Sequence, residues 1–110
     1  GSLVVLGDAG DFAASRMVAG TLVVAGSLGA HPAYRMRRGT LVCAGPAPAL
    51  GAGFVPVPGD CSVFWQLLSR DIARLAGPDS TLAELPKRRA VRRAGDLAVD
   101  GKGEVFSLGE

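Results

Sequence analysis

Short aliphatic runs bounded by glycine recur along the first 45 residues. Residues 1–7 (GSLVVLG), 20–26 (GTLVVAG) and 39–45 (GTLVCAG) follow one pattern and start 19 residues apart. Met17 and Met36 keep the same spacing. Each run is rich in Val and Leu and has the length of a short strand. A fixed period of this kind predicts stacked copies of one structural unit, because a single unit cannot bury its own apolar side.

Parallel stacking of these units predicts an all-β fold, a parallel β-helix with coils of about 19 residues. Each strand would pair with its copy one layer away, at a spacing of ~4.8 Å. We expect the bounding glycines to occupy corners, where φ is positive or where the backbones of two layers approach closely. These repeat glycines are Gly1, Gly7, Gly20, Gly26, Gly39 and Gly45.

The pattern changes after the third run, so we assign residues 1–53 to the coils and residues 54–110 to an extension that caps them. Residues 61–76 are predicted to be a helix that begins after Asp60 and ends at Gly77. Its apolar stripe is expected to contain Phe64, Leu67, Leu68, Ile72 and Leu75. Trp65 lies beside this stripe, which leaves two alternatives: a core position or a contact with another chain.

Two further elements are predicted in the extension. The T-x-x-E pattern of Thr81 and Glu84 has the form of a capping box and indicates a short helical turn before Pro86. Residues 97–99 and 104–106 are strand-like and flank a glycine-rich turn at 100–103, which predicts a terminal hairpin.

The first run opens the repeat with nothing before it to cover its edge. Gly1 and Ser2 also have the composition of a cloning scar, although they fall in phase with the later runs. We expect either that this chain is the C-terminal part of a longer β-helix or that a partner covers Leu3 to Leu6.

Composition excludes several classes of function. The net charge is +2, from 12 basic and 10 acidic residues, which is too small for a general nucleic-acid binder. No apolar run reaches the ~20 residues of a membrane helix. Cys43 and Cys61 match no metal-binding spacing, so no metal site is expected. Without a signal sequence or a disulfide framework, a cytoplasmic protein is predicted.

Three candidate sites remain. Five basic residues within residues 87–93 include Arg88, Arg89, Arg92 and Arg93, which could hold a polyanion. Asp8 and Asp11 lie in a glycine-rich turn, where bonds to backbone amides explain them more simply than acid–base chemistry or calcium binding. His31 is the one side chain that could act as a base at neutral pH, as in β-helical acyltransferases, but those repeat every 18 residues.

Several segments resemble a known family. Residues 7–12 (GDAGDF), 20–24 (GTLVV) and 36–41 (MRRGTL) are similar to the GXGXG-type right-handed β-helix in the C subunit of formylmethanofuran dehydrogenase, a repeat shared with large glutamate synthase subunits. Residues 62–71 (SVFWQLLSRD) and 95–104 (GDLAVDGKGE) most resemble the C subunit of the bacterial formyltransferase/hydrolase complex.

This resemblance implies a scaffold subunit without an active site of its own. The complexes of the family serve one-carbon metabolism: they move a formyl group from a tetrahydromethanopterin carrier to a methanofuran-type cofactor, and the bacterial complex then releases formate. Other subunits perform both steps, so the expected partners are those subunits. No catalytic residue and no bound cofactor carry over to this chain. The alternatives are a stand-alone acyltransferase that uses His31 and a β-helix domain of a glutamate-synthase-like protein.

Overall fold

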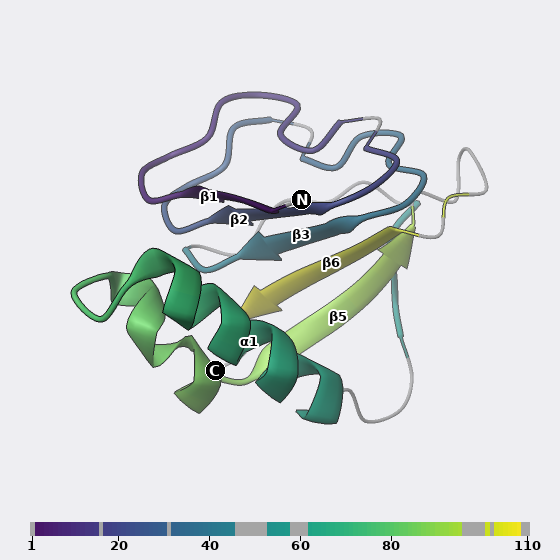
Figure 1. Cartoon of the computed structure of the whole chain (residues 1–110). Coiled ribbons are helices and arrows are strands. Elements are labelled where there is room, and N and C mark those ends of the chain that lie inside the picture. The colour runs from purple at the N-terminus through teal and green to yellow at the C-terminus, as the bar shows by residue number, and fades with distance from the viewer. Residues whose placement is uncertain are drawn as a thin grey trace.

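The computed structural model describes residues 2–15, 17–30, 32–45, 53–57, 62–95, 101 and 103–108. Its strands form one six-stranded sheet in the order β1-β2-β3-β6-β5-β4 (Figure 1). Four neighbouring strands are parallel: β1 (Ser2–Val5), β2 (Thr21–Val24), β3 (Thr40–Cys43) and β6 (Gly103–Leu108). The other two, β5 (Ala90–Gly95) and β4 (Val55–Pro56), are antiparallel to their neighbours.

The predicted fold class, an all-β right-handed parallel β-helix with coils of about 19 residues, is wrong. The described residues instead form a mixed sheet with a 15-residue helix, α1 (Ser62–Ala76), packed against it. The repeat supplies only β1, β2 and β3, and β3 pairs next with β6 from the C-terminal segment. Antiparallel β5 and β4 then extend the sheet, so the stacking ends after the third repeat strand.

The predicted alignment of the three repeat strands is confirmed. Thr21 pairs with Thr40, Leu22 with Leu41 and Val24 with Cys43, and β1 pairs with β2 at the same offset of 19. The connections after β1 and β2 also lie on one another in Figure 1. Backbone bonds join them, including Gly26 N–H to the Gly7 carbonyl at 3.0 Å and Arg37 N–H to the Met17 carbonyl at 2.9 Å. We call residues 2–19 the first layer and residues 20–38 the second layer.

The sheet separates two apolar cores because successive side chains of a strand point to opposite faces. On one face, Val23, Val42 and Phe106 form a cross-strand ladder that packs under α1 and the 3₁₀ helix η1 (Thr81–Lys87). On the other face, the turns of the two layers cover the side chains that alternate with this ladder: Val24, Leu41, Cys43 and Val105.

Helix α1 confirms the predicted helix to within one residue, but a different face of it is buried. Trp65, Ser69 and Ile72 face the core, whereas Phe64, Leu67 and Leu75 are exposed. The prediction of Phe64, Leu67 and Leu75 as part of the buried stripe is therefore wrong. Both aromatic side chains stack on Phe106, with ring centroids 5.6 Å away for Trp65 and 5.7 Å for Phe64, but only the indole of Trp65 is buried.

The helical turn before Pro86 exists as η1, and it is capped differently from the prediction. The side chain of Ser80, the residue before Thr81, accepts the Leu82 N–H at 3.0 Å. Glu84 forms an ion pair with Lys87 instead of returning to the cap. Pro86 lies inside η1.

The terminal strand is confirmed as β6, with a different partner from the predicted one. Glu104, Val105 and Phe106 pair with residues 92–94 of β5. The predicted partner strand, residues 97–99, lies outside the described residues. The sheet also crosses the predicted boundary between residues 53 and 54, because β3 pairs with β6.

Candidate functional site

Cys43 is placed for packing and not for chemistry. It occupies the end of β3 and is 1% exposed. Burial raises the pKa of its thiol from 9.0 to about 12, so the thiol stays protonated at neutral pH. Across the described ranges, no three His, Cys, Asp or Glu side chains come close enough together to hold a metal ion. His31 and Cys61 lie outside the described residues.

Asp8 and Asp11 join the two layers. An oxygen of the Asp8 carboxylate accepts the N–H of Ser27 at 2.7 Å, and one of Asp11 accepts the N–H of Ala30, also at 2.7 Å. Each acceptor thus bonds the residue 19 positions later, one layer further on. Backbone amides were expected as the partners of these carboxylates, and they are supplied by the next layer instead of by the local turn.

The repeat glycines serve two purposes. Gly20 and Gly39 have positive φ values of 83° and 97°, which a side chain disfavours. Gly26 and Gly45 instead lie under the backbone of the layer before: a β-carbon on Gly26 would be 2.7 Å from the Gly7 carbonyl oxygen and would also meet Asp8. A β-carbon on Gly7 would meet nothing within 4 Å. Gly1 lies outside the described residues.

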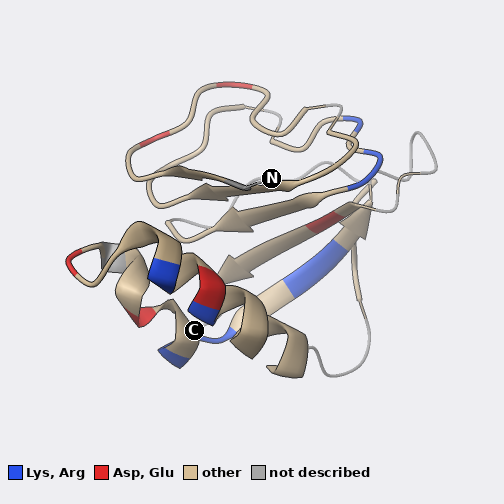
Figure 2. Ribbon diagram, in the orientation of Figure 1, with Lys and Arg blue, Asp and Glu red and all other residues tan. Residues whose placement is uncertain are grey.

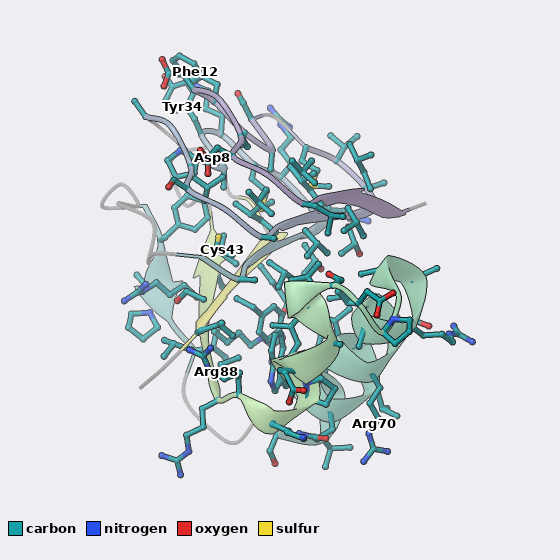
Figure 3. All side chains as sticks on the ribbon, turned by 90° about the vertical axis from the view of Figure 1, so that its left-hand side faces the viewer. Asp8, Phe12, Tyr34, Cys43, Arg70 and Arg88 are labelled. Carbon is teal, nitrogen blue, oxygen red and sulfur yellow. The ribbon has the colours of Figure 1, made fainter. Side chains whose placement is uncertain are left out.

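The four arginines of the basic cluster do not converge on one site. Arg88 and Arg89 lie exposed between η1 and β5, and Figure 3 shows Arg88 extending away from the molecule. Arg92 and Arg93 are neighbours on β5 and so point to opposite faces of the sheet. Arg92 forms an ion pair with Glu104 of β6, where Figure 2 shows opposite charges on adjacent strands.

Trp65 belongs to the core, which decides between the two alternatives. It is 3% exposed, and its indole N–H donates to the Arg88 carbonyl oxygen at 2.8 Å. Gln66 donates similarly to the Pro86 carbonyl oxygen at 2.7 Å. These bonds attach α1 to the end of η1, so the expected interface role of Trp65 does not agree with its position.

The described residues include two groups of exposed apolar side chains. The first, which we call the first-layer face, lies along the open edge of β1 and includes Leu3, Leu6 and Val18, each about 60% exposed. The second, the outer face of α1, consists of Val63, Phe64, Leu67 and Leu75, of which Phe64 also stacks on Phe106. The first-layer face was anticipated from the unpaired first run. The sequence did not predict the outer face of α1, because its residues follow the same helical spacing as a buried stripe. Only the position of Trp65 could have indicated which stripe of the helix is buried.

No helix in the described part of the chain combines the length and the apolar character needed to cross a bilayer.

Comparison with solved structures finds a chain in the formyltransferase/hydrolase complex (FhcABCD) from Methylorubrum extorquens in complex with methylofuran. The match covers 100% of this chain with 43% sequence identity and a TM-score of 0.83. This chain is similar to part of that complex. It spans 40% of the matched chain. No protein-family model and no curated protein matches the sequence.

Proposed function

We propose that this chain is a structural part of a formyltransferase/hydrolase complex and corresponds to a region of its C subunit. The proposal rests on the match to a chain of the Methylorubrum extorquens complex. The match covers the whole of this chain, with 43% sequence identity and a TM-score of 0.83. Sequence identity at this level indicates more than a shared fold. The resemblance of residues 62–71 and 95–104 to the C subunit supports this choice among the subunits.

A scaffold role fits the chemistry of the described residues. The buried thiol is protonated, and the two turn carboxylates are bonded to amides of the next layer. Meanwhile, the first-layer face and the outer face of α1 expose large apolar side chains in groups, which is typical of surfaces that bind other proteins. The formyl transfer and hydrolysis of the complex would take place on its other subunits.

Co-expression with the formyltransferase and hydrolase subunits encoded in the same genome tests this proposal. We expect the chain to elute with them as one species and to increase their yield or their rate of formate release. Elution of the chain by itself, with the other subunits assembled and fully active without it, would contradict the proposal. Acyl transfer by the isolated chain that disappears in His31→Ala would favour the acyltransferase alternative.

We further propose that the exposed part of the basic cluster attracts the anionic end of the methanofuran-type cofactor used by the complex. Arg88 and Arg89 are exposed, and no ion pair links either to another described residue, whereas Arg92 is paired with Glu104. Guanidinium groups bind carboxylates with two parallel hydrogen bonds, so two of them suit a tail of several carboxylates. Arg93 lies on the face of β5 opposite to Arg92 and would attract the tail only by long-range electrostatics.

Charge reversal separates this role from a general effect of net charge. In the assembled complex, the double variant Arg88→Glu, Arg89→Glu should weaken cofactor binding at low salt. Arg70→Glu, Arg74→Glu is the control, since both residues are exposed on α1, and Figure 3 shows Arg70 apart from Arg88. Equal affinity in the two double variants would contradict the proposed role.

A further inference from the structure

We draw no further inference here: the strongest candidate, the outer face of α1 with its exposed Val63, Phe64, Leu67 and Leu75, carries no proposal because nothing in the structure shows what covers it.

Discussion

Residues 2–7 and 21–26 read SLVVLG and TLVVAG, yet the two layers they open have different surroundings. Leu3 and Leu22 hold the same place in the repeat, and so do Gly7 and Gly26. The second layer is bonded on both sides, by the first layer and by β3 and its flanking residues, whereas the described residues bond the first layer on one side only. Substitutions at equivalent positions of the two layers therefore measure how much a neighbouring layer contributes to stability, because the local sequences are almost the same.

The largest difference is expected for the leucines of the repeat. Leu41→Ala removes a fully buried side chain between β2 and β6 and should cost about 2–5 kcal/mol of unfolding free energy. Leu3→Ala, at the equivalent exposed position, should change it by roughly 0.5 kcal/mol or less. Urea denaturation of both variants measures the difference. Equal losses would mean that the first layer is covered in the isolated chain.

The glycines should show the next largest difference. Gly26→Ala forces a β-carbon toward the Gly7 carbonyl and the Asp8 carboxylate, and should destabilise the chain by about 1–3 kcal/mol. Gly7→Ala should leave the stability unchanged or raise it by about 0.4–1 kcal/mol. The same denaturation experiment compares them. Destabilisation by Gly7→Ala would mean that the fold requires glycine at this position for a reason other than the space around its β-carbon.

A smaller effect is expected where the two layers are joined by carboxylates. Asp8→Ala removes the acceptor of the Ser27 N–H and should cost on the order of 1 kcal/mol, since the bond is exposed to water. Ser27→Ala, at the equivalent position of the second layer, should have no measurable effect because only its backbone takes part. Hydrogen exchange of the Ser27 amide would report the first change directly, and unaltered protection in Asp8→Ala would argue against the bond.

The smallest effect at neutral pH concerns Cys43, which takes the place of Val24 in the third repeat strand. Its folded pKa of about 12 exceeds the ordinary value of 9.0, so the folded chain retains the proton to higher pH than the unfolded chain does. The resulting stabilisation is fully present below about pH 9 and is lost as the pH rises toward 12. Cys43→Val should remove this alkaline loss. Alkylation of Cys43 at pH 8 should require unfolding, and rapid alkylation of the folded chain would contradict its burial.

Local patterns allowed part of this structure to be predicted. The period of 19 correctly placed Leu22 opposite Leu41, because equal spacing brings equal side chains into register in every layer. The limits of α1 followed from its flanking glycine and its apolar spacing. The exposure of Leu3 agrees with the place of β1 at the edge of the sheet.

Other features could not be predicted because they depend on segments far apart in the chain. The burial of Trp65 depends on Phe106 and on the Arg88 carbonyl, about 40 and 20 residues away. The pairing of Arg92 with Glu104 follows from the register of β5 against β6, and it removes one of four arginines from the predicted polyanion site. A basic run in sequence does not show which of its members share a face.

The amino-acid sequence alone determined where the repeat strands and the helix lie and how β1, β2 and β3 align, because those features arise from spacings within a few tens of residues. The tertiary structure decided that β6 follows β3 and that α1 buries Trp65 instead of Phe64. Several strands could compete for the open edge of β3, and the outcome depends on the apolar area that the whole chain buries. The chain therefore forms a mixed sheet covered by a helix and not the predicted stack of coils.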